Sequence, residues 1–291
     1  MSAAGPPKTA QLHSASGGSA AATAASVGVH VTSAGLHVEA AGHGPPVVLL
    51  HGWAMHSGVW GPLPAHLAKR HRVHAVDLPG HGRSRPVDPF TLDGIVAALE
   101  ATFDDDARAL AVLGWSFGGM IALRWARVHP ERIARLALVC TTPRFVAGQD
   151  WPHAMSQQTL SRFGDELHIA WKETVQRFLA LQIKGGEHAR AVLAGLRAQL
   201  YARGEPSPRV LAAGLEVLRN ADLRAEVRAI EQPALVIAGS RDTLTLPAAG
   251  EWLAATLPHA RFALIDGAAH APFLSHADAV EALLDRFLDA C

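Results

Sequence analysis

A short motif near the middle of the chain carries the pattern of a catalytic nucleophile. The sequence GWSFG at residues 114–118 is a G-x-S-x-G motif between the apolar run ALAVL and the helical run MIALRWARVH. Glycines at these positions allow a sharp turn from strand to helix, which lifts the serine hydroxyl off the sheet. The amino end of the helix adds its positive dipole beside any charge that develops there. We therefore interpret Ser116 as a nucleophile.

A serine requires a base and an orienting carboxylate, and suitable residues follow later strands. Asp242 comes directly after the run ALVIAGS, and His270 comes directly after FALIDGA. The order Ser, Asp, His, with each residue after a strand, matches a nucleophile carried on a turn of this kind. The sequence therefore predicts a triad of Ser116, Asp242 and His270.

Other histidines and aspartates fit this triad less well, although the chain has 17 histidines. Three histidines precede the nucleophile or lie in a helical region: His51, His81 and His276. Asp266 is still on the strand before His270, and Asp77 in VDLPGHGRS is interpreted as structural. Because HExxH and comparable ligand spacings are missing from the sequence, we expect neither a metal nor another cofactor.

An oxyanion hole requires two backbone N–H donors. We expect one from Phe117, the residue after the nucleophile, and the other from Trp53 in the HGW motif after the run VVLL. The ring of Trp53 would also line the pocket. Serine at position 116, where an aspartate would be needed, disfavours dehalogenase and epoxide hydrolase chemistry.

The elements that position these residues alternate along the chain. Continuous apolar runs such as PPVVLLHG, ALAVLGWS and PALVIAGS are typical of strands buried on both faces. Helical patterns such as TLDGIVAALEATF lie between them, and a hairpin, VGVHVTSAG with LHVEAAG, precedes them. This alternation predicts an α/β fold with a mostly parallel sheet flanked by helices.

One interval interrupts the alternation, because no buried strand is evident between Cys140 and Pro233. Its pattern is helical: in WKETVQRFLALQ the residues Trp171, Val175 and Phe178 recur on one helical face. We therefore expect a helical cap inserted between the sixth and seventh strands.

These patterns divide the chain into a tail, a core and a cap. We assign residues 144–224 to the cap and residues 27–143 and 225–291 to the core. Residues 1–26 consist almost wholly of small residues and proline, which indicates a disordered tail. The tail lacks the apolar segment of a secretory signal.

Composition excludes several classes of protein. The 26 basic residues balance 26 acidic ones, so no basic field is present for nucleic acid. The two cysteines, Cys140 and Cys291, are too few for a disulfide scaffold and fit a reducing compartment. No apolar run approaches the roughly 18–20 residues that span a bilayer. We expect a cytoplasmic monomer without a membrane or nucleic-acid partner.

Together, HGW, VDLPGHGRS, the G-x-S-x-G turn and the late Asp and His resemble the α/β-hydrolase superfamily across residues 27–291. Within it, the chain is similar to the pimeloyl-[acyl-carrier protein] methyl ester esterases of biotin synthesis. That similarity rests on LLHGWAMHSGVW, GWSFGG, DWP, RFLALQ, GLEVLRNADLR and AAHAPFLSH. RFLALQ and GLEVL are the most diagnostic because they lie in the cap, which varies most. The departures are Phe117, where that family often has Leu, and the long tail.

The resemblance implies a serine carboxylesterase that removes the methyl group from the pimeloyl ester on its acyl-carrier protein. The substrate would contact residues around the nucleophile and one segment of the cap: Trp53, Ser116, Phe117 and His270, with Phe178, Leu179, Ala180, Leu181 and Gln182. From Lys172 to Arg209, seven basic residues stand against three acidic ones. Since the carrier is acidic, three cap cations are expected to face it: Arg177, Arg190 and Arg197.

Two kinds of alternative remain. A broad-specificity short-chain carboxylesterase, a C–C bond hydrolase or a cofactor-free haloperoxidase would share the triad, so only the cap residues argue against them. A non-catalytic binding protein of this fold would be expected to have lost part of the triad, whereas all three members are present.

Overall fold

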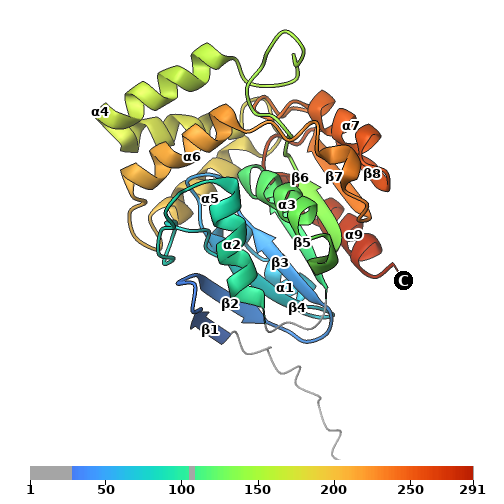
Figure 1. The fold of residues 1–291 in the computed structure, drawn as a ribbon. Helices are drawn as coiled ribbons and strands as arrows, with labels where there is room; N and C mark the ends of the chain where they lie inside the picture. Colours follow the sequence, from blue (N-terminus) through green and yellow to red (C-terminus); the bar gives the residue numbers. More distant parts are fainter. Residues whose placement is uncertain (1–27, 105–108, 291) are drawn as a thin grey trace, which may run out of the picture.

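A computed structural model describes residues 28–104 and 109–290, and these form an eight-stranded sheet between layers of helices (Figure 1). The strands lie in the order β1-β2-β4-β3-β5-β6-β7-β8. Their bounds are β1 Gly28–Val31, β2 His37–Ala41, β3 Pro46–Leu50, β4 Arg72–Val76, β5 Leu110–Trp115, β6 Ile133–Val139, β7 Ala234–Gly239 and β8 Ala260–Ile265. Strand β3 pairs in parallel with β4 and with β5, and β5–β6, β6–β7 and β7–β8 are parallel pairs too. This confirms the predicted mostly parallel sheet.

The first two strands form the expected antiparallel hairpin, and β2 also pairs antiparallel with β4. Every residue of β3, β5 and β7 is buried, as the continuous apolar runs predicted, whereas every residue of the edge strand β1 is exposed. The carboxyl ends of these buried strands lead to Trp53, Ser116 and Asp242, whereas His270 follows β8, whose residues are mostly half-buried or exposed.

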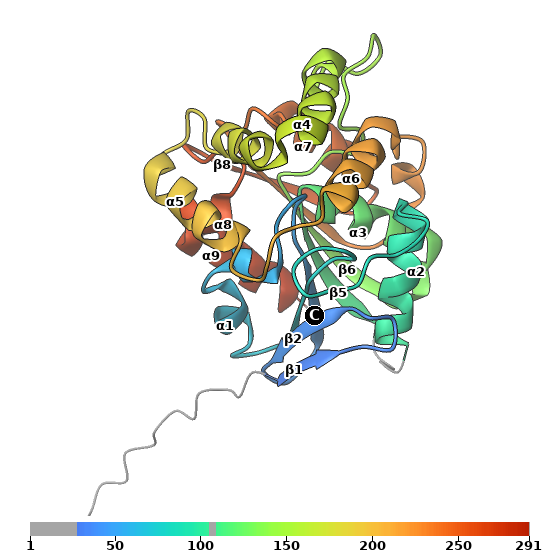
Figure 2. The ribbon, with the colours of Figure 1, turned by 90° about the vertical axis from the view of Figure 1, so that its left-hand side faces the viewer.

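Helices cover both faces of the sheet (Figure 2). On one face, α3 contacts β5 and β6 and α7 contacts β7, while α2 packs on α3; on the other face, α1 contacts β4 and α9. The bounds of the core helices are η1 Ser57–Trp60, α1 Leu63–Leu67, α2 Leu92–Phe103, α3 Phe117–Val128, η2 Pro130–Arg132, η3 Val227–Ala229, α7 Pro247–Thr256, α8 Pro272–Ser275 and α9 Ala277–Leu288.

The cap helices α4 (Gln157–Gln182), α5 (Ala189–Leu200) and α6 (Pro208–Asn220) lie between β6 and β7 in the chain. This confirms the predicted helical insertion between the sixth and seventh strands. They stand over the end of the sheet where β3 and β5 finish (Figure 1). Helix α4 is kinked at Ala170, where φ is −146° and ψ is 64°. The domain boundaries at residues 144 and 224 stay predictions.

Four charged residues join the beginning and the end of the insertion, and we call them the neck: Arg144, Asp150, Asp222 and Arg224. Arg144 pairs with Asp222 in an isolated antiparallel bridge. Arg224 NH2 lies 2.8 Å from Asp150 Oδ2 and 2.7 Å from Asp222 Oδ2. The chain therefore leaves the core and returns to it at one place, where ion pairs and a backbone bridge hold the two ends of the insertion together.

Two sequence predictions fall outside the described residues: the disordered tail at 1–26 and the free thiol of Cys291. Among the helices of the described ranges, none combines the length and the apolar character needed to cross a membrane.

Candidate active site

Ser116 occupies a strained turn between β5 and α3. Its φ of 55° and ψ of −116° are unfavourable for a residue with a side chain. Glycines make the turn possible: a Cβ at Gly114 would lie 2.5 Å from the Gly118 carbonyl oxygen, and a Cβ at Gly118 would lie 2.1 Å from the carbonyl oxygen that ends β3. The Ser116 carbonyl accepts a hydrogen bond of 2.7 Å from Thr141 Oγ1. Close packing therefore holds the serine in its conformation.

The predicted acid and base are in direct contact. Asp242 follows β7 and His270 follows β8, and His270 Nδ1 lies 2.8 Å from Asp242 Oδ2. Both side chains are buried. Because an ionised carboxylate can only accept, the shared proton is on Nδ1, and Nε2 is left as the basic nitrogen. This is the tautomer that a base for a serine hydroxyl requires.

The carboxylate of Asp242 is held by three further donors. Its Oδ1 accepts from the amides of Leu244 at 2.8 Å and Thr245 at 3.1 Å, and its Oδ2 accepts from Thr245 Oγ1 at 2.7 Å. Thr245 was not among the predicted site residues. Its place three residues after an aspartate in a turn is a local signal that could have identified it.

The segments that follow β8 and β3 both pass close to the turn at Ser116. Trp115 Nε1 donates to the His270 carbonyl at 2.8 Å, which ties the histidine loop to the end of β5. A Cβ placed at Gly52 would lie 3.4 Å from the Cβ of Ser116. The loop after β3 and the loop after β8 therefore meet at the serine, which is 8% exposed.

The two expected oxyanion donors stay predictions that the backbone contacts support. Trp53 and Phe117 are buried, and within residues 28–104 and 109–290 no acceptor is recorded for the backbone N–H of either. Buried backbone donors are normally paired. Two unpaired amides, one next to Ser116 in sequence and one in the loop that touches it, suit the stabilisation of an oxyanion.

Two of the histidines that compete with His270, His51 and His81, form hydrogen bonds outside the predicted triad. His51 Nδ1 donates to the Gly52 carbonyl at 2.8 Å, while its Nε2 accepts from the Leu78 amide at 2.9 Å. Burial lowers the pKa of His51 to about 3, so the ring is neutral and both nitrogens are occupied. His81 Nδ1 lies 3.0 Å from the Pro79 carbonyl, and burial lowers its pKa too.

The competing aspartates also have other partners. Asp266 accepts from Ser240 Oγ at 2.9 Å. Asp77 is fully buried and accepts from the amides of Ser57 at 2.8 Å and Arg83 at 2.9 Å. Asp77 therefore holds two loops together, as its structural interpretation expected.

The five cap residues predicted to line the acyl tunnel divide between two faces of α4. Three of them are buried: Phe178, Leu179 and Gln182. The ring of Phe178 meets Trp53 edge to face at 4.8 Å between centroids. Leu181 is half-buried and Ala180 is exposed, so these two residues stay predictions that their burial does not support. Five consecutive residues cover more than one helical turn of about 3.6 residues and cannot all face one pocket.

Gln182 links the cap to the base. Its carbonyl accepts the His270 amide at 3.0 Å, and its side-chain Oε1 is buried with no partner in the described part of the chain. A buried unpaired acceptor is costly, so a bound ligand with a donor would be favoured here.

The three predicted docking arginines are exposed but differently placed. Arg190 and Arg197 are two turns apart on one face of α5, and Arg197 Nε donates to Gln176 Oε1 at 2.9 Å. Arg177 lies on α4 and forms an ion pair with Glu166. The structure therefore brings Arg190 and Arg197 onto one face and gives Arg177 an acidic partner.

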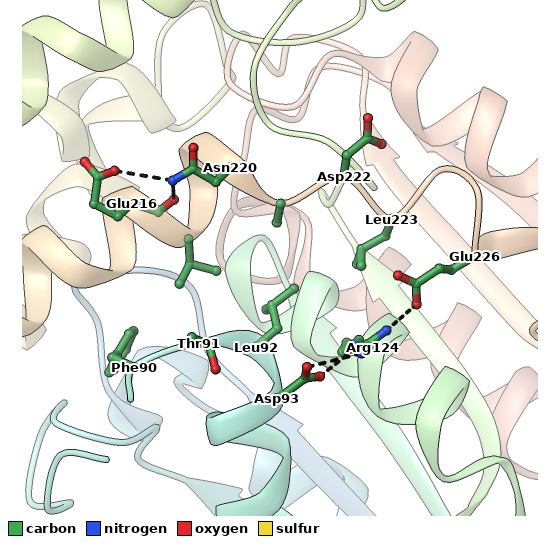
Figure 3. A pocket seen from close by; sticks show the side chains of 12 residues that line it. Phe90, Thr91, Leu92, Asp93, Arg124, Glu216, Asn220, Asp222, Leu223 and Glu226 are labelled. Atoms are coloured by element: carbon green, nitrogen blue, oxygen red, sulfur yellow. Dashed lines mark hydrogen bonds and ion pairs between the residues drawn. The ribbon is translucent and has the colours of Figure 1, made fainter. Parts of the chain in front are cut away.

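Two open cavities lie along α6, one lined by residues that Figure 3 shows. Their volumes are about 430 and 800 Å³, and both are lined by Phe90 and Glu216. Beside the first, Arg124 binds Asp93 and Glu226 at 2.6 Å each (Figure 3). Ser116 lines neither of these two cavities.

One group of side chains in the described ranges has the spacing of metal ligands: Cys140, Asp242 and His270, whose ligand atoms lie within 4.8 Å of one another. Burial raises the pKa of the Cys140 thiol well above its ordinary value, so the thiolate that binds metals is disfavoured. Since Asp242 and His270 already bind each other, the group is better described as part of the acid–base pair.

Known proteins share both the sequence and the fold. The alpha/beta hydrolase fold family matches residues 45–277. The pimeloyl-[acyl-carrier protein] methyl ester esterase of Xanthomonas axonopodis pv. citri (strain 306) is 49% identical over 250 residues, covering 85% of this chain and 96% of that protein. The protein of the same name from Nitrosomonas europaea is 44% identical over 234 residues, covering 80% and 92%.

Solved structures agree on the architecture. An esterase from Exiguobacterium antarcticum superimposes with a TM-score of 0.81 at 21% identity, covering 88% of this chain and 96% of that one. A hydrolase from Pseudomonas aeruginosa PA01 gives a TM-score of 0.72 at 27% identity, covering 91% and 98%.

Proposed function

The chain belongs to the α/β-hydrolase family, and we propose that it is a serine carboxylesterase that hydrolyses the methyl ester of pimeloyl-[acyl-carrier protein] in biotin synthesis. The observation that carries this proposal is the 49% identity to a protein of that name over 250 residues. In a chain of 291 residues, a match of that length includes α4 to α6, the segment in which hydrolases of this fold differ most. The contact between Asp242 and His270 supports the same chemistry, as does the hydrogen bond from Trp115, the residue before Ser116, to the His270 carbonyl.

The proposed reaction proceeds through an acyl-enzyme. His270 Nε2 takes the hydroxyl proton of Ser116 as Oγ attacks the ester carbonyl, and the amides of Trp53 and Phe117 bind the oxyanion. The C–O bond breaks and methanol leaves with the proton from His270. Water, deprotonated by His270, then attacks the acyl carbon; the bond to Ser116 Oγ breaks, His270 returns the proton to Oγ, and the free carboxylate leaves. Asp242 stabilises the imidazolium in both steps.

The cap supplies substrate choice in this proposal. Phe178 and the Trp53 ring form an apolar wall for the pimeloyl chain. Arg190 and Arg197 face the acidic carrier protein, joined by Arg177 when it exchanges Glu166 for a carrier carboxylate. The proposal includes a monomer acting in the cytoplasm, with no cofactor.

The test compares a carrier-bound methyl ester with a small uncharged ester at low and high salt. Reversing Arg177, Arg190 and Arg197 to Glu should raise KM for the carrier-bound ester roughly tenfold and weaken its salt dependence, because rim charges steer association. Turnover of the small ester should hardly change. The matched control is Arg209→Glu, an exposed cap cation outside the docking set.

Two results would contradict the proposal. If reversing the three arginines changed KM for neither ester in a folded variant, the cap would not dock a carrier protein. Wild-type enzyme that cleaves a free methyl ester as well as the carrier-bound one would favour a broad-specificity carboxylesterase.

A further inference from the structure

In the described structure, three side chains of segment 53–57, which follows β3, are bonded to the cap. All three are buried. Their partners lie between the end of α5 and the first turn of α6: Leu211 O at 3.0 Å from Trp53 Nε1, Gln199 O at 2.6 Å from His56 Nε2, and Arg203 NH1 at 2.6 Å from Ser57 Oγ. The segment that carries one oxyanion donor therefore depends on the cap for its side-chain hydrogen bonds.

Arg203 is the strongest of these links. Its side chain is only 11% exposed, and its NH1 lies 3.1 Å from Asp77 Oδ1, while NH2 lies 2.5 Å from Glu39 Oε1. Asp77 also accepts the Ser57 amide at 2.8 Å, so Arg203, Ser57 and Asp77 close a ring of hydrogen bonds. A cap side chain thus completes a buried ionic network of the core.

Burial fixes the charge state of this network. Desolvation raises the pKa of Asp77, but the Arg83 and Ser57 amides and nearby charge outweigh it and keep that pKa below its ordinary value. His56 accepts the Gly58 amide on Nδ1, and burial lowers its pKa, so it is a neutral donor through Nε2. Neither Asp77 nor His56 therefore has to gain or lose a proton to form its hydrogen bond to the cap.

We propose that the cap completes the oxyanion hole. Arg203 is a positioning residue: through Ser57, and together with the cap contacts of Trp53 and His56, it holds the Trp53 amide over Ser116. Closure of the cap and assembly of the hole are then one conformational step. This inference rests on the proposed function, because it concerns the same oxyanion.

The arrangement couples docking to catalysis. Arg197, which faces the carrier in the proposed function, and Gln199, whose carbonyl holds His56, lie in the same last turn of α5. A partner that binds the closed cap more tightly than the open one must therefore favour the assembled hole. An ester without a carrier gains no such help.

The experiment removes the link without touching the triad. Arg203→Met keeps the aliphatic stem, and Ser57→Ala removes the accepting hydroxyl while leaving the pair of Arg203 with Asp77. The control is Lys172→Met, another cap cation paired with an acid, Glu205, away from segment 53–57. The readouts are kcat and KM for an uncharged nitrophenyl ester, and the inhibition constant of a trifluoromethyl ketone that forms an oxyanion on Ser116.

We expect Arg203→Met to lower kcat roughly 10- to 100-fold with little change in KM, and to weaken the ketone by a similar factor, as loss of an oxyanion donor does. Ser57→Ala should lower both about threefold to tenfold in the same direction, and Lys172→Met should change neither. Melting temperatures accompany each assay. If Arg203→Met fails to fold, Ser57→Ala decides.

Folded variants with wild-type kcat and wild-type ketone affinity would overturn this inference, as would a change in KM alone. Both results leave the proposed function intact, since the wild type still hydrolyses esters. Inactive wild-type enzyme, by contrast, would overturn the proposed function first.

Discussion

The carboxyl end of the sheet and the outer surface of the cap differ in how much freedom their residues have. A methyl group added at Gly118 would lie 2.1 Å from a backbone oxygen, and Asp242 is held by several donors. On the cap, Ile169 beside the kink in α4 is 87% exposed, and Arg190 on α5 is exposed as well. The first region admits one arrangement, while the second leaves its surface open to change.

This difference separates reaction from recognition. Substitutions at the end of the sheet should affect every ester alike, because they alter the common transition state. Substitutions on the outer cap should distinguish one ester from another. The predictions below test that division, beginning with the largest effect.

Ser116→Ala should lower kcat by about 10⁴- to 10⁶-fold on both carrier-bound and small esters, since it removes the attacking hydroxyl. Rates are measured with nitrophenyl and methyl esters, and circular dichroism checks the fold. Residual activity above about one per cent of wild type would exclude Ser116 as the nucleophile.

Asp242→Asn should lower kcat about 10⁴-fold on both esters, because the amide favours the wrong tautomer of His270. The matched control is Asp266→Asn, which should leave the rate nearly unchanged because Asp266 bonds to Ser240. A damaging Asp266→Asn beside a harmless Asp242→Asn would reverse the assignment.

Phe178 lies at the boundary of the two regions, so Phe178→Ala should slow the hydrolysis of both esters. Opening the wall beside Trp53 should lower kcat/KM about tenfold to a hundredfold by loosening the substrate near Ser116. Loss of a buried ring should also lower the free energy of unfolding by roughly 3–5 kcal/mol. Ala180→Ser, on the exposed face of α4, is the control; if it matched Phe178→Ala, both faces would contribute to the pocket.

The smallest predicted effect is on the way the free energy of unfolding depends on pH. Histidine in an unfolded chain titrates near pH 6.5, while burial lowers the pKa of His51 to about 3 and also lowers that of His81. At pH values below 6.5 the unfolded state binds more protons than the folded state. The contribution of these neutral histidines to the free energy of unfolding is therefore complete above pH 6.5 and decreases as the pH falls. Each such histidine contributes a slope of up to about 1.4 kcal/mol per pH unit.

His81→Asn tests that slope. Asparagine retains a donor for the Pro79 carbonyl but does not titrate, so urea unfolding between pH 7.5 and 5 should show a shallower fall, by up to about one proton. An unchanged slope would mean that His81 does not contribute.

The same division explains what could be predicted from the sequence. Ser116, Asp242 and His270 come within a few residues of the ends of β5, β7 and β8, so local patterns were enough to predict them, and the strand–helix alternation predicted the sheet. The pairing of Arg203 with Glu39 spans 164 positions, and no local signal reveals it. The exposure of Ala180 was not foreseen, because a run of consecutive residues does not by itself show which way each one faces around a helix.

The neck makes the cap a separate unit that is joined to the core at one place. The insertion leaves β6 and returns at β7, which are neighbours in the sheet, and its two ends are stapled by Arg144, Asp150, Asp222 and Arg224. A foreign cap could therefore be grafted between these strands without shifting the turn at Ser116. Such a chimera would still need a replacement for Arg203, because a lid that only covered the pocket would leave segment 53–57 without its support.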